Sequence, residues 1–151
     1  MVRMTTVLAS GVFDLIHYGH IRFLEEAKKA GGKDSKLVVI VARDETVKRL
    51  KGSFPVIPED QRRAIVESLE VVDEALLGFE DLDLTRVIQQ LKPEIIVVGH
   101  DQGYICDQLN KIKKVLEMDF KITKIEKFGE DDLNSSSKIK RRIVEGARTR
   151  E

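Results

Sequence analysis

Continuous apolar runs recur along this chain of 151 residues, each bounded by polar residues or glycine. Short runs of this kind are typical of strands that helices cover on both faces of a parallel sheet. The last run differs, because its apolar and polar residues alternate as in a half-buried strand. The predicted strands are residues 4–9, 36–42, 74–78, 94–99 and 120–128.

Segments with the period of a helix lie between these runs. One of them begins at Pro58, which suits the first helical position, and Glu59 and Asp60 complement the positive end of the helix dipole. The basic stretch at 47–54 is interpreted as a segment that folds over a helix start. The predicted helices begin near residue 17 and then span residues 58–69, 83–91, 106–117 and 137–146.

This alternation predicts the α/β class, with a Rossmann-like open parallel sheet of about five strands and helices on both faces. The length fits a single domain over residues 1–151. In such sheets, ligands bind at the carboxyl ends of the strands. The sequences GVFD, ARDE and GHDQ follow the first, second and fourth predicted strands, so they meet at this edge.

The charge and cysteine content narrow the class of protein. The 26 Lys and Arg residues balance the 26 Asp and Glu residues, so the overall charge favours neither a nucleic acid nor a membrane as partner. The single cysteine, Cys106, excludes an internal disulfide and a CxxC metal cluster. With no secretory signal and no apolar run near about 18 residues, we expect a cytoplasmic protein.

Two histidines, His17 and His20, lie three residues apart after the first predicted strand, with Gly19 between them. If Gly19 lies in the first helical turn, this spacing places both imidazoles on one side of that turn, beside backbone N–H groups without a helical partner. Gly11, which opens the segment, allows a ligand to approach the backbone closely, or a positive φ. Such a site suits a chain of phosphates.

A zinc site and a dinucleotide site fit this segment poorly. The HxxH pair has no third His or Cys nearby and lacks the Glu of HExxH, and no GxGxxG follows the first strand. Transfer of a nucleotidyl group fits better, because it needs N–H donors and positive charge around a five-coordinate phosphorus. For either histidine alone, a helix cap or a surface position is the simpler interpretation.

The helix after Pro58 carries two adjacent arginines, which must face different ways. Arg62 lies on the side of Ile65, Val66 and Leu69, the predicted buried stripe, whereas Arg63 lies on the charged face. We therefore predict that Arg62 points inward and faces the phosphates.

Lys48 and Lys51 are further candidates for phosphate binding, although an ordinary solvated surface explains isolated charges equally well. Near the C-terminus, Asn134 or Ser135 can cap the last predicted helix. Hydroxyl groups at this helix start, backed by Lys138, would make a second anion-binding end. The hydroxyl groups belong to Ser135, Ser136 and Ser137.

The string GVFDLIHYGH contains an HxGH motif and, with SSSKIK near the C-terminus, resembles the cytidylyltransferase-like branch of the nucleotidyltransferase superfamily. The SSSKIK segment aligns with the ISTTxIK-type motif of that family. Within the family, VARDETV, PEDQRRAIV, VVDEALLG and GHDQ are most similar to the archaeal FAD synthases. Glycerol-3-phosphate cytidylyltransferase is similar in its HxGH and STTKIK motifs and less similar in the middle segments.

The resemblance implies an enzyme that transfers AMP from ATP to FMN, a divalent metal that is usually Mg²⁺, and a homodimer. It implies catalytic roles for His17 and His20, and with them we place Arg62. The implied nucleotide-binding residues are Gly11, Val12, Phe13, His17, His20, Asp101, Ser135, Ser136 and Ser137.

The chain departs from the cytidylyltransferases just before the C-terminal hydroxyls. Those enzymes have an arginine in RTEGIS, whereas GEDDLNSS has acids in that place. Asp101 and Gln102 are then candidates for binding the base or ribose, although Asp101 can also be a helix cap. Asp14 is expected to orient loop groups, because a carboxylate repels phosphates unless a metal intervenes. Two alternatives stay open: a cytidylyltransferase using CTP and glycerol 3-phosphate or another phosphorylated alcohol, and a nucleotide-binding module without turnover.

Overall fold

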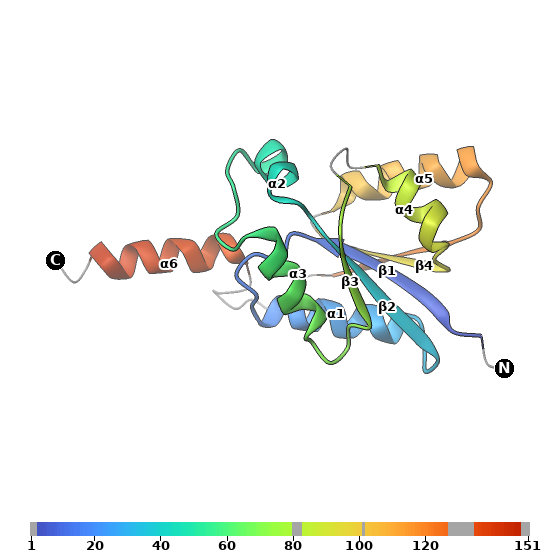
Figure 1. The fold of residues 1–151 in the computed structure, drawn as a ribbon, viewed down its shortest axis with the longest axis horizontal. Helices are drawn as coiled ribbons and strands as arrows, with labels where there is room; N and C mark the ends of the chain where they lie inside the picture. Colours follow the sequence, from blue (N-terminus) through green and yellow to red (C-terminus); the bar gives the residue numbers. More distant parts are fainter. Residues whose placement is uncertain (1–2, 80–82, 101, 127–134, 149–151) are drawn as a thin grey trace.

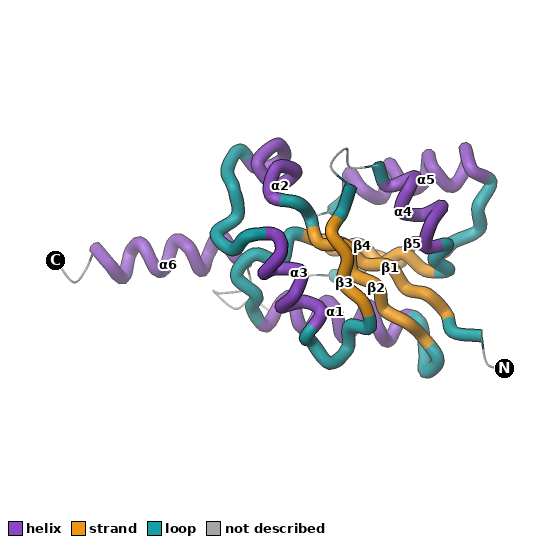
Figure 2. The backbone as a smooth tube through the Cα atoms, viewed as in Figure 1, coloured by secondary structure: helices purple, strands orange, loops and turns teal. Residues whose placement is uncertain are grey.

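The computed structural model describes residues 3–79, 83–100, 102–126 and 135–148. Within these residues, a five-stranded parallel sheet lies between two layers of helices (Figure 1), and Figure 2 shows the strands as a single twisted layer. The predicted fold class is therefore confirmed. The strands are β1 (Thr5–Gly11), β2 (Ser35–Val41), β3 (Glu74–Leu77), β4 (Ile95–Gly99) and β5 (Lys121–Ile125), in the spatial order β3-β2-β1-β4-β5.

The helices divide between the two faces of the sheet. Helices α1 (Tyr18–Ala30) and α3 (Glu59–Glu67) pack on one face, and α4 (Leu84–Leu91) and α5 (Gly103–Leu116) pack on the other. Two more helices are α2 (Asp44–Lys51), which follows β2, and α6 (Ser136–Arg148). In the described part of the chain, no helix combines the length and apolarity that a membrane span requires.

The core follows from the alternation of side chains along each strand. In β1, Val7 and Ala9 pack against α1 and α3, whereas Leu8 points to the α4 and α5 side. The adjacent strands alternate in the same way, with Val39 on the first face and Val38 on the second. Both faces of the central strands are thus buried, which explains why these strands appear in the sequence as continuous apolar runs.

Helix α2 was not predicted. Its local signals are present, since Asp44 and Glu45 occupy the first turn, basic residues occupy the last, and Gly52 ends the helix with φ 85°. The helix is only eight residues long, and of its side chains only Thr46 and Val47 are buried. So short an apolar stripe does not stand out from the surrounding charged residues.

The boundaries differ slightly elsewhere. Helix α5 begins at Gly103, three residues before its predicted start, and α6 runs two residues beyond its predicted end. The last predicted strand is observed as β5, and its residues 127–128 lie outside the described part of the chain.

The strand order reverses between β1 and β4, because the chain goes from β1 outward to β2 and β3 and then crosses to β4. The β1–β4 pairing ends at Ala9 and Val97, so the carboxyl ends of the two strands separate. The Gln102 side chain bridges them, since its Nε2 donates to the Ser10 carbonyl (3.2 Å) and its Oε1 accepts from the Gly99 N–H (2.9 Å). Such a switch point is where open α/β sheets bind ligands.

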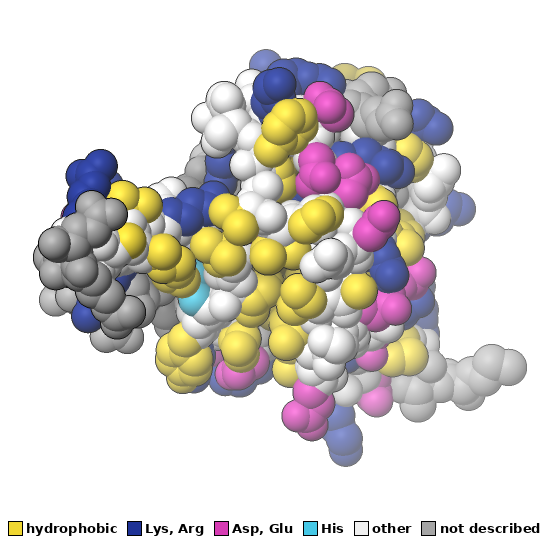
Figure 3. Space-filling model, turned by 60° about the vertical axis from the view of Figure 1, so that its left-hand side comes forward, with side chains coloured by type: hydrophobic (Ala, Val, Ile, Leu, Met, Phe, Trp, Pro, Cys, Tyr) yellow, Lys and Arg dark blue, Asp and Glu magenta, His cyan; other side chains and the backbone are white. Residues whose placement is uncertain are grey.

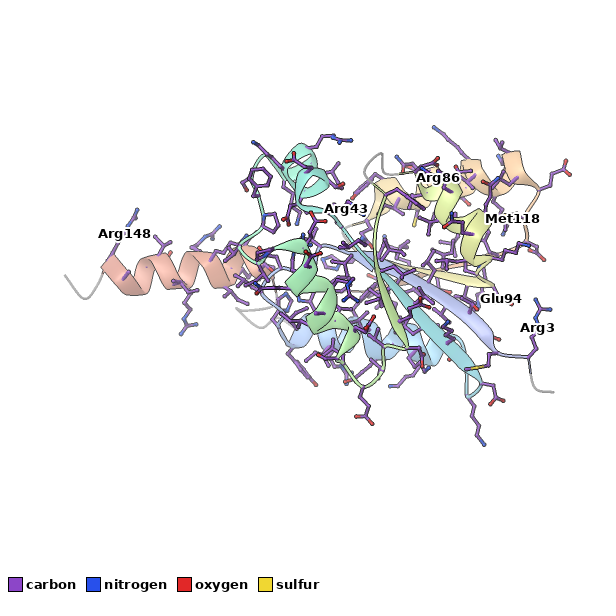
Figure 4. The ribbon with its side chains drawn as sticks, viewed as in Figure 1. Arg3, Arg43, Arg86, Glu94, Met118 and Arg148 are labelled. Carbon is purple, nitrogen blue, oxygen red and sulfur yellow. The ribbon has the colours of Figure 1, made fainter. Side chains whose placement is uncertain are left out.

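Helix α6 extends away from the body of the molecule (Figure 1), and Figure 4 shows Arg148 at its far end. None of its residues is buried. Its first turns contact the loop after β1, through Ser136 and Lys140.

Candidate active site

His17 and His20 lie side by side at the start of α1, as their spacing predicts. The ring centroids are 3.9 Å apart. His17 is the N-cap residue, and its Nδ1 accepts from the Gly19 N–H at 3.1 Å. In return, His20 Nδ1 accepts from the His17 N–H at 3.2 Å, which completes a capping box made of two imidazoles. The caps therefore fix the orientation of both rings.

These caps also fix the protonation of the two rings. A backbone N–H can only donate, so each Nδ1 is an acceptor, and the neutral ring carries its proton on Nε2. Burial lowers the pKa of His17. Burial, followed by the charges of His17 and Lys51, lowers the pKa of His20 to about 4. At neutral pH both rings are therefore uncharged and can donate a hydrogen bond from Nε2. Positive charge beside them comes from Lys51.

The loop before the histidines has an unusual backbone. Phe13 (φ 55°) and Leu15 (φ 50°) both adopt the left-handed region, which is strained for residues with a side chain. The Phe13 ring folds back over Gly11, where a Cβ would lie 2.9 Å from Phe13 Cε2. The packing of this ring therefore favours glycine at position 11, and of the two alternatives given for Gly11 the positive φ is not observed.

The Phe13 side chain is 3% exposed and its ring lies 5.4 Å from that of His20. It supports the histidine from the core side. The Val12 carbonyl accepts a hydrogen bond from Arg62. The nucleotide contacts of Gly11, Val12 and Phe13 stay a prediction.

Asp14 joins three segments of the chain. Its carboxylate accepts from the Val56 N–H (2.8 Å) and the Ile57 N–H (2.9 Å) and pairs with Lys140 Nζ (3.0 Å), while its carbonyl accepts from the Ser136 hydroxyl. Burial by itself would raise the pKa of Asp14, but the two N–H groups and the Lys140 ammonium outweigh it and lower the pKa. The predicted role of Asp14, orienting loop groups, agrees with these contacts.

Arg62 points inward, as predicted, but its guanidinium faces protein acceptors. The side chain is 0% exposed. Its N–H groups donate to the carbonyls of Ile57, Val12 and Ala42 and to the Asp44 carboxylate, at 2.6 to 2.8 Å. The prediction that Arg62 faces the phosphates is thus corrected, because its guanidinium N–H groups already bind loop carbonyls and a carboxylate of the protein. Arg62 is a positioning residue that holds the ends of β1 and β2 against the start of α3.

The rotation of α3 is also partly corrected. Arg62 and Val66, four residues apart, are its buried residues, whereas Ile65 is 41% exposed. This helix of nine residues thus buries only a narrow stripe of side chains. Arg63 lies on the charged side as predicted, where it binds Glu67 at 3.0 Å, and it also reaches the Ala75 carbonyl at 3.3 Å.

The C-terminal hydroxyls are divided among different tasks. Ser135 Oγ accepts from the Lys138 N–H and caps α6, Ser136 Oγ binds the Asp14 carbonyl, and Ser137 is exposed. The predicted cap at Ser135 is confirmed, and Asn134 lies outside the described residues. Ser137 is the most exposed of the three, whereas Ser135 and Ser136 are half-buried.

The two lysines of α2 have different neighbours. Lys48 Nζ lies 4.5 Å from the centroid of the Phe54 ring, and Lys51 is close enough to His20 to lower its pKa. Asp101 lies outside the described residues. Gln102 bridges β1 and β4 instead of standing free for a base, which replaces its predicted role with a structural one.

Sequence reasoning missed three residues that build the site. Asp44 binds Arg62, Lys140 binds Asp14, and Arg43 binds the Gly78 carbonyl (2.6 Å) and Glu59 (3.1 Å). Figure 4 shows Arg43 where β2 passes into α2. Only the acidic start of α2 gave a local signal, since the other contacts join distant parts of the chain.

Comparisons with known proteins agree over most of the chain. A family model described as cytidylyltransferase-like matches residues 8–142. An FAD synthase from Methanothermobacter thermautotrophicus is 44% identical over 140 residues, or 93% of this chain and 91% of that protein. An FAD synthase from Archaeoglobus fulgidus is 45% identical over 138 residues, or 91% of this chain and 96% of that protein.

Solved structures agree on the fold. The crystal structure of a lipopolysaccharide core biosynthesis protein from Thermoplasma volcanium has a TM-score of 0.75 and 42% identity, over 84% of this chain and 100% of that one. A protein of unknown function from Archaeoglobus fulgidus has a TM-score of 0.62 at 22% identity, over 81% of this chain and 89% of that one, which shows similarity of fold alone.

Proposed function

Since the chain belongs to the cytidylyltransferase-like family, we propose that it is an FAD synthase, which transfers the AMP moiety of ATP to FMN and releases pyrophosphate. The observation in the structure that carries this assignment is the pair of neutral, capped imidazoles at the N-terminus of α1. They lie after the first of the two strands that form the switch point of the sheet.

In this reaction an oxygen of the FMN phosphate attacks the α-phosphorus of ATP. The bond from that phosphorus to the bridging oxygen breaks, and pyrophosphate leaves with the electron pair. Negative charge grows on the non-bridging α-oxygens in the five-coordinate transition state. The Nε2–H groups of His17 and His20 donate to these oxygens, and the fixed caps mean that the rings need no reorientation.

Positive charge around the phosphates comes from neighbouring groups. Lys51 lies near His20, and the first N–H groups of α1 form the positive end of the helix dipole. The exposed Ser137 hydroxyl and Lys138 at the start of α6 are proposed to contact the nucleotide phosphates. Arg62 and Asp14 act through the loops that they hold.

We propose Mg²⁺ as the divalent metal, bound through the phosphates of ATP. Among the described residues, no group of three or more His, Cys, Asp or Glu side chains could hold a metal ion. The Asp14 carboxylate already binds two N–H groups and a lysine. These residues therefore do not form a metal site of their own, and Mg²⁺ commonly retains waters and binds substrate phosphates.

We also propose a homodimer in the cytoplasm. The exposed apolar side chains of α6, Ile143 (62%) and Val144 (49%), support self-association, and light scattering of the purified protein tests it.

The test of the function is an assay of ATP and CTP against FMN and glycerol 3-phosphate, with Mg²⁺ present. Pyrophosphate and the nucleotidylated product are measured in each of the four mixtures. We expect FAD from ATP and FMN, with slower turnover of CTP. Turnover confined to CTP and glycerol 3-phosphate would identify a cytidylyltransferase, and no pyrophosphate from any mixture would identify a binding module.

A further inference from the structure

The connection between α2 and α3 presents two apolar side chains to solvent. Phe54 is 50% exposed and Val56 is 58% exposed. Among the phenylalanines that the structure describes, Phe54 is the only one with an exposed side chain. Figure 3 shows hydrophobic side chains gathered around a histidine at the surface, beside the base of α6. The Phe54 ring is thus accessible to a ligand from solvent.

This connection is fixed at both ends. Gly52 closes α2, and the N–H groups of Val56 and Ile57 bind the Asp14 carboxylate. The Ile57 carbonyl accepts from Arg62. The Cα atoms of Phe54 and Val56 are at most about 7 Å apart along the chain. The backbone that carries Phe54 is therefore held two residues from the contact with Asp14, in the loop that leads to the histidines.

Positive charge accompanies this ring. Lys48 Nζ lies 4.5 Å from the ring centroid, a cation–π contact. One turn further along α2, Lys51 is close enough to His20 to influence its titration. Lys48 thus accompanies the aromatic ring, and Lys51 accompanies the imidazole N–H donors. A ligand that complements both pairs has a flat aromatic part and a phosphate.

We propose that Phe54 stacks against the isoalloxazine ring of FMN, with Lys48 and Lys51 guiding the FMN phosphate toward the histidines. This inference rests on the proposed function and extends it, because it assigns the acceptor subsite to the connection between α2 and α3. Electron-poor aromatic rings stack well on phenylalanine, and the ribityl chain of FMN separates its ring from its phosphate. The nucleotide then occupies the opposite side of the histidines, toward β4 and α5.

The test compares Phe54→Ala and Phe54→Leu with the wild-type protein, and it uses Ile65→Ala as the matched control. Ile65 is also an exposed apolar residue, but it lies on α3. Steady-state FAD formation gives the KM for FMN and the KM for ATP. We expect both Phe54 variants to raise the KM for FMN about tenfold, the size of a lost stacking contact, and to leave the KM for ATP within about twofold. Ile65→Ala should change neither constant.

A second measurement separates the ring from the phosphate. Ribitol 5-phosphate has the phosphate and the chain of FMN without the ring, so its inhibition constant against FMN should be the same for wild type and Phe54→Ala. Quenching of flavin fluorescence on binding should weaken in Phe54→Ala. Thermal unfolding of both variants near the wild-type temperature shows that the fold is kept.

Each outcome separates this inference from the proposed function. If wild-type protein forms FAD and Phe54→Ala leaves the KM for FMN unchanged, the subsite is wrong and the function stands. A rise in the KM for ATP alone would assign Phe54 to the adenine. A change in molar mass by light scattering, with both constants unchanged, would assign the ring to contact between copies. Absence of FAD formation by the wild-type protein refutes the function itself.

Discussion

The sharpest prediction concerns Asp14→Asn, a change that keeps the shape of the side chain and removes its charge. Each carboxylate oxygen accepts one backbone N–H, from Ile57 and from Val56. The asparagine keeps one acceptor oxygen, whereas its amide nitrogen can only donate. One part-buried N–H of the connection between α2 and α3 must therefore lose its partner.

The magnitude follows from these contacts. The loss of one hydrogen bond from an N–H to the charged carboxylate costs about 1–3 kcal/mol, and the ion pair with the half-exposed Lys140 adds about 0–1 kcal/mol. We expect the free energy of unfolding to fall by roughly 1–4 kcal/mol, which leaves a typical domain folded. The control is Lys140→Met, which removes only the ion pair and should cost less than about 1 kcal/mol.

The dependence on pH gives a second check. The folded-state pKa of Asp14 is lowered, because the N–H groups and Lys140 outweigh the cost of burial. The contribution of the Asp14 carboxylate to folding stability is therefore fully present above the pKa of the unfolded state, about 3.9. It is lost as pH falls through the lower pKa of the folded state. The stability difference between wild type and Asp14→Asn should narrow in acid. Urea unfolding, followed by circular dichroism at neutral and acid pH, measures this difference.

We also expect Asp14→Asn to lower turnover. Asp14 holds the connection between α2 and α3 and the start of α6, so we expect kcat/KM for FMN to drop at least about tenfold while the protein stays folded. Equal stability of wild type and Asp14→Asn at neutral pH, or a difference that does not change with pH, would refute this reasoning.

Four further predictions follow from the site. His17→Ala and His20→Ala should each lower kcat about 10²-fold in the FAD formation assay with the fold intact, and near-normal kcat in a folded variant would contradict their assignment. NMR titration of the free protein should show His20 protonating near pH 4, because burial lowers its pKa to about 4. A midpoint at about pH 6.5 would contradict its buried, capped position. Arg62→Met should lower the free energy of unfolding in urea by about 3–5 kcal/mol, since it leaves the Asp44 carboxylate and three carbonyls unpaired. Arg63→Ala should lower it by less than about 1 kcal/mol, and equal costs would mean that α3 is rotated differently. Chelation by EDTA should abolish FAD formation and leave the unfolding temperature unchanged, because we propose that the metal binds through ATP; a lowered unfolding temperature would point to metal ligands on the protein.

Local patterns were sufficient for most of the fold. Continuous apolar runs predicted the strands, since burial of both faces of a parallel sheet leaves no polar face to alternate with. The HxGH spacing predicted that His17 and His20 share one helical turn, and the rings do lie together. The pattern failed at α2, where Thr46 and Val47 are the only buried residues and charged side chains occupy most of the other positions.

Only the tertiary structure decided what the polar side chains bind. The sequence determined that Arg62 points inward, because orientation on a helix depends on neighbours three and four residues away. It did not determine that the guanidinium meets the carbonyls of Val12 and Ala42, which are 50 and 20 residues away. In the same way, Asp14 binds amides 42 and 43 residues further along the chain. These hydrogen-bond partners depend on how the crossovers between strands bring strand ends and loops together. The hydrophobic period of a segment does not specify that geometry.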